Sequence, residues 1–239
     1  ICVPSEKTQS VKFRILQLLL VLLCAVPQLQ WGFVAHRKIN EMAVFTLPPE
    51  MIRFYKQNLD YIRDHSVSPD KRRYTIPDEG PRHYLDLDHY GDSAMHILPI
   101  YWNEAKARFG EDSLNSHGVL PWHIYRVFGQ LRVAFVNNDV PRILRYSADL
   151  GHYVADAHVP LHTTTNYDGQ LTGQFGIHGL WESRLPELYM DEYDFLVGGA
   201  SYVESPQHLA WRIVLYSHVL VDTVLSLEKS LTVEFGQTK

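Results

Sequence analysis

Within the stretch from residue 152 to residue 182, two histidines are each followed, four residues later, by a carboxylate: His152 by Asp156, and His178 by Glu182. Residues four apart project from the same face of an α-helix, so each pair places an imidazole beside a carboxylate. His162 lies between the two pairs, just beyond a helix-breaking proline, where the chain can turn back. This spacing requires a fold in which helical segments bring several nitrogen and oxygen donors together.

Imidazole and carboxylate donors without thiolates are typical of a hydrolytic zinc site that keeps open coordination positions. A single His-x3-Asp pair is more often a surface hydrogen bond or a charge pair. Recurrence of the pattern around His162 favours metal binding by the whole set. Asp149 shares the His152 face and either orients an imidazole or is simply solvated. The remaining histidines considered are interpreted as structural or surface residues: His117, His123, His158, His208 and His218.

The first 30 residues differ from the rest of the chain. Lys12 and Arg14 precede an apolar run over residues 15–26 that is interrupted only by Gln17. This run is too short to span a bilayer, which needs about 20 residues. A basic flank before a short apolar core is typical of a secretory signal peptide. We therefore predict that residues 1–30 are a signal peptide and that the mature protein is secreted or periplasmic.

The positions of the cysteines and the net charge limit what can stabilise the protein and what can attract a phosphate. Cys2 and Cys24 both lie in the predicted signal peptide, so disulfides are excluded from residues 31–239 and bound metal is one alternative. Subtracting the leader's formal net charge of +2 from the chain's −5 leaves −7. An acidic protein has no general attraction for nucleic acid or anionic lipid, so any affinity for phosphate has to be local.

Apolar residues recur at helical spacing along most of the chain. We expect helices over residues 37–46, 50–64, 97–109, 121–137 and 141–159, another from residue 180, and a last long helix from residue 206. Residues 65–92 and 163–179 are predicted to be loop regions, the first with short elements. No repeat, low-complexity tract or linker divides residues 31–239, which indicates one all-α domain.

The order of motifs resembles the superfamily of zinc-dependent phospholipases C and single-strand-specific zinc nucleases, and is most similar to secreted bacterial phospholipase C-like proteins. The shared motifs are, in chain order, Trp31-Gly32 with His36, then His152, Asp156 and His162 as H-x3-D-x5-H, then His178 with Glu182. They cover most of residues 31–185. The resemblance implies a compact helical bundle around a cleft that holds three zinc ions.

The resemblance also implies which residues hold each ion. One zinc would be bound by Asp70, His83, His152 and Asp156, and a second by His162, His178 and Glu182. The third would use His36, a bridging Asp156, and the α-amino nitrogen and carbonyl oxygen of Trp31 as the mature N-terminus.

That third zinc depends on cleavage between Gln30 and Trp31, because only a free terminal amine can form a chelate with its own carbonyl. Signal peptidase prefers small residues before the cut, and neither Gln28 nor Gln30 is small. Cleavage after Ala25 would leave Trp31 within the chain and reduce the expectation to two zinc ions.

The implied activity is phosphodiester hydrolysis, in which clustered zinc ions lower the pKa of a water molecule. Asp70 would be the general base that orients or deprotonates this water, and Asp60, Asp64 and Asp78 are nearby acidic alternatives. The predicted substrate is a phospholipid headgroup or small phosphodiester, and no obligate protein partner is evident.

Two other functions remain open at this stage. Single-stranded nucleic acid or a nucleotide is the alternative substrate: the Glu182 ligand favours the phospholipases, whereas the short spacing from Trp31 to His36 favours the nucleases. A secreted protein that zinc only stabilises is the third hypothesis. The open, glycine-rich loop before His178 is unlike a closed structural zinc site and disfavours it.

Overall fold

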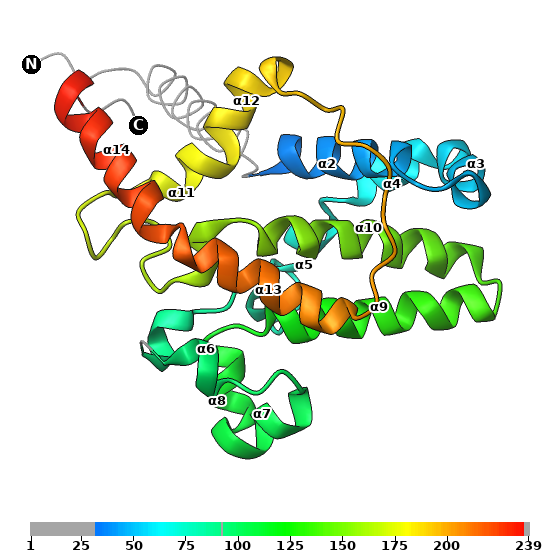
Figure 1. The fold of residues 1–239 in the computed structure, drawn as a ribbon, viewed down its shortest axis with the longest axis horizontal. Coiled ribbons are helices and arrows are strands. Elements are labelled where there is room, and N and C mark those ends of the chain that lie inside the picture. The colour runs from blue at the N-terminus through cyan, green and yellow to red at the C-terminus, as the bar shows by residue number, and fades with distance from the viewer. Residues whose placement is uncertain (1–31, 92, 237–239) are drawn as a thin grey trace, which may run out of the picture. The chain divides into compact units, whose positions relative to one another are not determined.

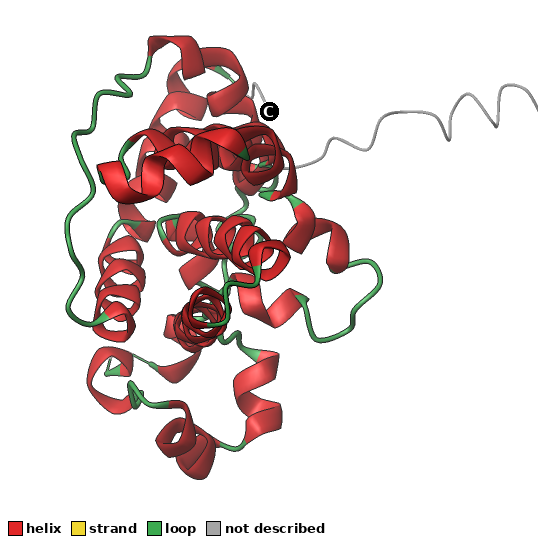
Figure 2. Ribbon diagram, turned by 90° about the vertical axis from the view of Figure 1, so that its right-hand side faces the viewer, coloured by secondary structure: helices red, strands yellow, loops and turns green. Residues whose placement is uncertain are grey.

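The computed structural model describes residues 32–91 and 93–236 (Figure 1). Trp31 and the predicted signal peptide, residues 1–30, lie outside the described residues. Helices, turns and loops make up the described part of the chain, which contains no strand (Figure 2). The all-α class predicted from the sequence is therefore confirmed.

Two antiparallel helices form the centre of the fold: α9 (Leu120–Val136) and α10 (Val140–Ala157) (Figure 1). Each has a proline in its first turn, where the missing N–H has no intrahelical partner to lose. Asn138 turns the chain between them with a φ of 51°. Asp139 then caps α10, because its carboxylate accepts a hydrogen bond from the backbone N–H of Arg142 at 3.2 Å.

Further helices pack around this pair. The helices α2 (Phe33–Phe45) and α4 (Leu59–His65) contact α10, and α13 (Pro206–Val219) contacts α9. The other helices are α3 (Pro49–Gln57), α5 (Ser68–Arg72), α6 (Ala94–Ile97), α7 (Trp102–Phe109), α8 (Glu111–Ser116), α11 (Ile177–Gly179), α12 (Leu185–Tyr189) and α14 (Val221–Phe235). Short 3-10 turns are η1 (Gly80–His83), η2 (Leu87–Tyr90), η3 (Pro160–Thr163) and η5 (Met190–Glu192), and η4 (Leu180–Arg184) is a π-helical turn.

The apolar core is divided between two sides of α10. On the α9 and α13 side, Trp122 lies edge-on to Trp211, with ring centroids 5.0 Å apart. On the α2 and α4 side, Val44 and Ile62 pack with Ala148, which has no exposed surface. With an apolar cluster on each side, α10 is held in place along its length, and its remaining polar face has a fixed position.

Three of the predicted helices are wrong in extent. The helix expected over residues 97–109 begins only at Trp102, as α7, because residues 98–101 are not helical. The helix expected over residues 50–64 is interrupted at Asn58, whose side-chain amide donates to the Phe54 carbonyl at 2.9 Å and so competes with the helical backbone. The long helix expected from residue 206 breaks at Leu220, and the change of direction keeps Val221 and Val224 buried. The predicted loop 65–92 also contains α5, η1 and η2.

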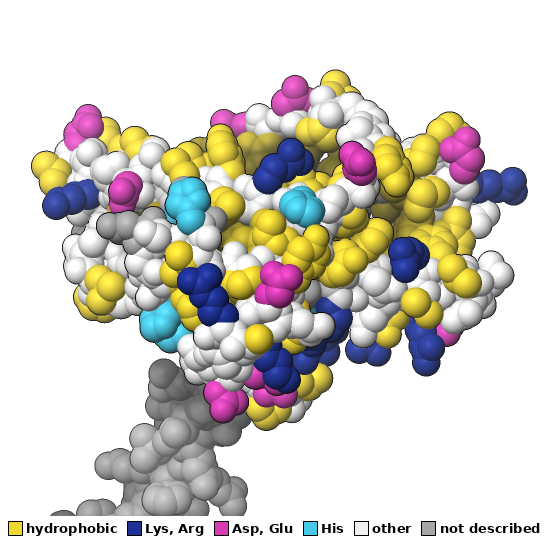
Figure 3. All heavy atoms as spheres, turned by 60° about the horizontal axis from the view of Figure 1, so that its bottom comes forward, with side chains coloured by type: hydrophobic (Ala, Val, Ile, Leu, Met, Phe, Trp, Pro, Cys, Tyr) yellow, Lys and Arg dark blue, Asp and Glu magenta, His cyan; other side chains and the backbone are white. Residues whose placement is uncertain are grey.

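The stretch Pro206–Phe235 is long and apolar enough, by length and composition alone, to cross a membrane. Within the fold, α13 buries Ala210, Trp211 and Val214 in the core. Apolar side chains also reach the surface among scattered charged ones, as the face in Figure 3 shows. Such scattered exposure is ordinary for a globular protein.

His123 of α9 is the most strongly perturbed histidine away from the polar face of α10. It is 7% exposed, and its ring lies edge-on to Tyr153 with centroids 4.5 Å apart. Burial, together with the nearby Arg82 and Arg126, lowers the pKa of His123 from 6.5 to about 2. The folded protein therefore holds this imidazole neutral, whereas the unfolded chain binds a proton as the pH falls below 6.5.

We expect His123→Phe to make the protein less sensitive to acid. In the wild type, proton uptake by the unfolded chain lowers the free energy of unfolding as the pH falls, and this loss ends only near the folded pKa. Between about pH 7.5 and about pH 5 it amounts to about 2 kcal/mol. Urea unfolding at the two pH values should show that the variant loses less stability than the wild type by this amount. An equal loss in both proteins would contradict the assignment of His123 as a buried neutral group.

Candidate metal centre

The polar face of α10 carries His152 and Asp156, one helical turn apart. Both side chains are inaccessible to solvent, at 0% and 1% exposure. His152 Nε2 lies 3.2 Å from Asp156 Oδ2, which is the convergence that the spacing predicts. An ionised carboxylate and an imidazole in this position are costly to bury, so each needs partners from other elements.

Close approach of α2 brings His36 to this face. Gly151 is required for that approach, because a Cβ at this position would overlap the side-chain oxygen of Asn40. The Asn40 amide donates to the Ala148 carbonyl at 3.0 Å and links the two helices. Asn40 is one turn beyond His36, and Ala148 is one turn before His152. Their contact therefore sets the imidazoles against each other, stacked with centroids 4.0 Å apart.

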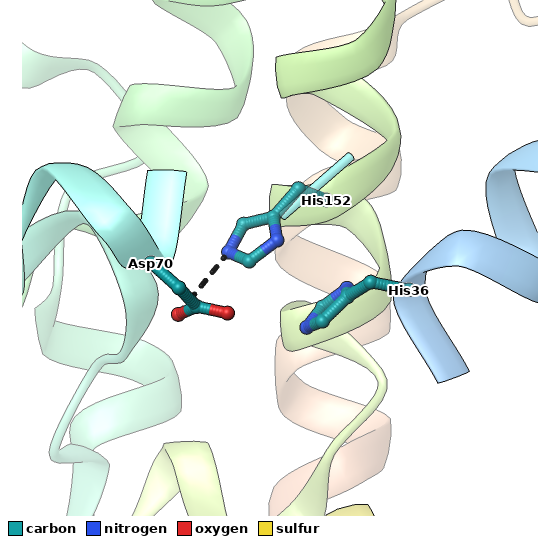
Figure 4. Close-up of side chains that lie close together, drawn as sticks. All are labelled: His36, Asp70 and His152. Carbon is teal, nitrogen blue, oxygen red and sulfur yellow. Dashed lines mark ion pairs between the residues drawn. The ribbon is translucent and has the colours of Figure 1, made fainter. Parts of the chain in front are cut away.

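Asp70 and His83 come from the region that was predicted to be a loop. Asp70 lies in α5 and His83 ends η1, and both point to the α10 face. His83 Nδ1 is 2.9 Å from Asp156 Oδ2 and 3.0 Å from His152 Nε2. Asp70 Oδ1 lies 3.7 Å from His83 Nδ1 and 3.8 Å from His152 Nε2. Figure 4 shows Asp70 and His36 on either side of the His152 ring.

A second group of donors lies farther along the chain. His162 in η3 meets Glu182, with Nε2 and Oε1 2.7 Å apart, and His178 Nε2 lies 3.0 Å from the other oxygen of the same carboxylate. The two imidazole Nε2 atoms are 3.4 Å apart. Glu182 does not follow His178 on a regular α-helix as predicted, because the π-helical turn η4 begins at Leu180. Such π-turns occur frequently at functional sites.

Backbone contacts fix the orientation of His178. Its Nδ1–H donates to the Tyr167 carbonyl at 3.2 Å, which leaves Nε2 to face Glu182. Asp168 accepts hydrogen bonds from the backbone N–H groups of Gly176 at 3.1 Å and of His178 at 3.4 Å. Hydrogen bonds within the loop before His178 therefore hold its backbone in place.

Asp156 connects the two groups of donors. Its Oδ2 faces His83 and His152, whereas its Oδ1 lies 3.3 Å from His36 Nε2 and 3.7 Å from His162 Nδ1. One carboxylate thus presents each of its oxygens to a different pair of imidazoles, which is the arrangement of a bridging ligand.

The electrostatics follow from this burial and pairing. Burial raises the pKa of Asp156, but His152 and His162 outweigh this effect and hold it well below its usual value. Burial lowers the pKa of His162, yet Glu182 and Asp156 together raise it to about 9. Burial also raises the pKa of Glu182, but His162 and His178 hold it well below its usual value. For Asp70, burial and the neighbouring carboxylates outweigh the attraction of His152 and His36, so its pKa is raised. The site therefore contains two firmly ionised carboxylates and one that holds its proton more readily.

These residues fit a metal ion. Three groups place their ligand atoms within 4.8 Å of one another: His36, Asp70 and His152; His83, His152 and Asp156; and His162, His178 and Glu182. Nitrogens of neighbouring imidazoles face each other at 3.0 Å and 3.4 Å, where a cation would give their lone pairs a common partner. The described residues can therefore hold metal at more than one position.

The structure brings together eight of the nine residues proposed from the sequence, and the ninth, Trp31, lies outside the described residues. Gly32, the residue after it, has a φ of 75° and donates its N–H to Ser183 Oγ at 2.8 Å. The acidic alternatives to Asp70 are elsewhere: Asp60 and Asp64 pair with Arg63, and Asp78 is exposed.

Three supporting residues were not found from the sequence: Asn40, Gly151 and the buried Glu79. Only a glycine inside an otherwise regular helix signals the first two, because it indicates close approach of another element. Asp149 neither orients an imidazole nor is solvated. It is buried and accepts two hydrogen bonds from Arg72, each of 3.1 Å.

We expect Gly151→Ala to destabilise the protein by about 1–3 kcal/mol, because the added methyl group forces α2 away from α10. The same displacement should separate His36 from His152 and weaken metal binding. Gly129→Ala is the matched control, since a Cβ on that α9 glycine has nothing within 4 Å and should be neutral or stabilising. Urea unfolding and zinc titration measure both effects. Equal stability of the two variants would contradict the tight contact.

Asp156→Asn should remove most of the stabilisation that a bound metal ion gives. A ligand at 100 times its dissociation constant adds about 2.7 kcal/mol of stability, and the neutral amide cannot bridge two cations as the carboxylate can. The quantity to compare is the Tm difference between zinc-loaded and chelator-treated protein, because it is insensitive to changes in the metal-free fold. Asp222→Asn on α14 is an exposed control. A wild-type Tm shift in Asp156→Asn would exclude a bridging role.

Comparison with protein-family models, with curated proteins and with solved structures gives no match for this chain. The functional interpretation therefore depends on the chemistry of the site and on the motifs in the sequence.

Proposed function

We propose that this protein is a zinc-dependent phosphodiester hydrolase, and that three zinc ions bind when Trp31 is the mature N-terminus and two when it is not. One observation carries the proposal: four imidazoles from separate helices and turns converge on the carboxylate of Asp156. The resemblance of the motifs to zinc-dependent phospholipases C and zinc nucleases supports the same activity.

Zinc suits this donor set because imidazole nitrogens and carboxylate oxygens without thiolates are its ligands in hydrolytic sites. Bound there, zinc would act as a Lewis acid and lower the pKa of a water molecule to near neutrality. The carboxylates of Asp156 and Glu182 hold their imidazole partners in place for such ions. No lysine or arginine is needed to neutralise a phosphate, which agrees with the chain's net charge of −5.

Asp70 is the best candidate for the general base. Its side chain is 17% exposed, whereas the neighbouring His152 and Asp156 side chains are at 0% and 1%, so it lies where the cluster reaches solvent. Burial raises the pKa of its carboxyl group, which makes it a better proton acceptor than a solvated aspartate. Asp70 would accept the proton of an attacking water and hold that water in line with phosphorus.

The segment that carries His178 and Glu182 also contains exposed aromatic side chains. Tyr167, Phe175 and Trp181 are 55%, 64% and 38% exposed, and the Tyr167 ring lies edge-on to His178 at 6.1 Å. Such rings can cover the apolar part of a phospholipid, which we place first as the substrate class. They can equally stack on bases, which keeps single-stranded nucleic acid or a nucleotide as the second candidate.

The hypothesis of a zinc-stabilised protein without activity requires a site that is closed to solvent. A structural zinc site is closed, with every coordination position filled by protein. Here the Asp70, His178 and Glu182 side chains remain 17%, 16% and 10% exposed, which leaves a side from which substrate can approach. We also propose export to the periplasm or medium, on the strength of the basic and apolar leader sequence.

Zinc content and hydrolysis of bis-p-nitrophenyl phosphate, measured on full-length protein produced in an exporting host, test this proposal. We expect two or three zinc ions per chain and activity that a chelator abolishes. Asp70→Asn should lower kcat by about 10²–10⁴-fold, the usual contribution of a general base. Asp60→Asn, a change at an exposed carboxylate outside the centre, should leave kcat unchanged. Bound zinc without turnover on phospholipid, oligonucleotide or the chromogenic diester would instead support the structural hypothesis.

A further inference from the structure

Beside the proposed metal centre lies a buried carboxylate that the proposed reaction does not use. Glu79 has no exposed surface and precedes η1, the turn that ends at His83. Its Oε2 accepts a hydrogen bond from Arg82 at 2.6 Å, and its Oε1 accepts one from Arg72 at 3.2 Å and another, very short, from the Tyr153 hydroxyl. These donors keep the carboxylate ionised and fix its position.

His83 lies between this carboxylate and the metal centre. Its Nδ1 faces Asp156 at 2.9 Å, on the metal side. Its Nε2 points the other way, is buried without a hydrogen-bond partner, and lies 3.9 Å from Glu79 Oε1. The two ring nitrogens therefore face two different carboxylates.

The tautomer of His83 decides whether its Nδ1 can bind a cation. To bind a cation, Nδ1 has to offer its lone pair, so the proton must lie on Nε2. A buried Nε2–H needs an acceptor, and a ring movement of about 1 Å towards Glu79 would bring it into hydrogen-bonding range. Tyr153 guides such a movement, because its ring packs edge-on to His83 at 5.4 Å while its hydroxyl binds Glu79.

We propose that Glu79 is a positioning residue: it accepts the Nε2–H of His83 and so commits Nδ1 to metal binding. This inference rests on the proposed function, since it presupposes that the cluster holds zinc. Metal-binding histidines commonly donate their second N–H to a carboxylate, which fixes the ring and raises its basicity. Here the carboxylate is itself held by Arg72 and Arg82, so it cannot turn away.

If Glu79 acted only as the counter-ion of Arg72 and Arg82, its loss would affect zinc binding no more than the loss of another carboxylate in the same network. Arg72 is also bound by Asp149 through two hydrogen bonds of 3.1 Å, so Asp149 is a second buried carboxylate in the same network. Asp149, however, makes no contact with an imidazole among those the structure records. Asp149→Asn is therefore the matched control for Glu79→Gln.

The experiment measures zinc affinity by competition with a chromophoric chelator, and the nitrogen-bound imidazole protons by NMR on 15N-histidine-labelled, zinc-loaded protein. Glu79→Gln should weaken zinc binding by about tenfold to hundredfold. The Nε2–H resonance of His83, shifted downfield by the carboxylate in the wild type, should move upfield in the variant. Asp149→Asn should reduce stability but change neither the zinc affinity nor this resonance.

The outcomes separate the two proposals. A wild type that binds no zinc would overturn the proposed function and this inference together. A wild type that binds zinc, with unchanged affinity and resonance in Glu79→Gln, would overturn the inference alone, as would equal weakening in Glu79→Gln and Asp149→Asn. If Glu79→Gln does not fold, Glu79→Asp replaces it. The shorter side chain keeps the charge, withdraws it from Nε2 and should weaken zinc binding in the same direction.

Discussion

The buried carboxylate of Asp156 is the group on which the rest of the site depends. Removing a carboxylate from water costs several kcal/mol, and only partners with complementary charge offset that cost. Four imidazoles surround Asp156 as charged or hydrogen-bonding partners, from His36, His83, His152 and His162, and only His152 belongs to the same helix. Packing of α2, η1 and η3 around α10 is therefore tied to the chemistry of one side chain as well as to burial of apolar surface.

This dependence explains the small and polar residues behind the cluster. Gly151 exists where a side chain would separate α2 from α10, and Asn40 uses the space to hydrogen-bond across the contact. Behind His83, the second layer consists of Glu79 with its arginines rather than apolar side chains. A polar layer is costly to bury, but it can fix the direction of an imidazole, which an apolar layer cannot do.

Local geometry is what the sequence predicts best. The His152–Asp156 and His178–Glu182 pairs could be derived from helical spacing, and the all-α class follows from the apolar periodicity. His36 and His83 came only from the resemblance, because no local period relates residues so distant in the chain. The break at Asn58 and the π-turn before Glu182 depend on side-chain competition and packing that spacing does not encode. Glu79 could not be identified from the sequence, because no local spacing relates it to Tyr153 or to the metal centre.

The residues of the cluster differ in their exposure to solvent. In the proposed enzyme, the buried residues would retain the metal and the exposed ones would lie where substrate approaches. His83, His152 and Asp156 are closed off from solvent, so an ion held there exchanges only when the fold opens. Asp70 and Glu182 lie at the rim, where a metal ion that they hold could take up a further ligand from solvent without unfolding of the protein. A site with both environments can keep its metal firmly and still turn over substrate. A fully closed site would only retain its metal, and a fully exposed cluster would only admit substrate.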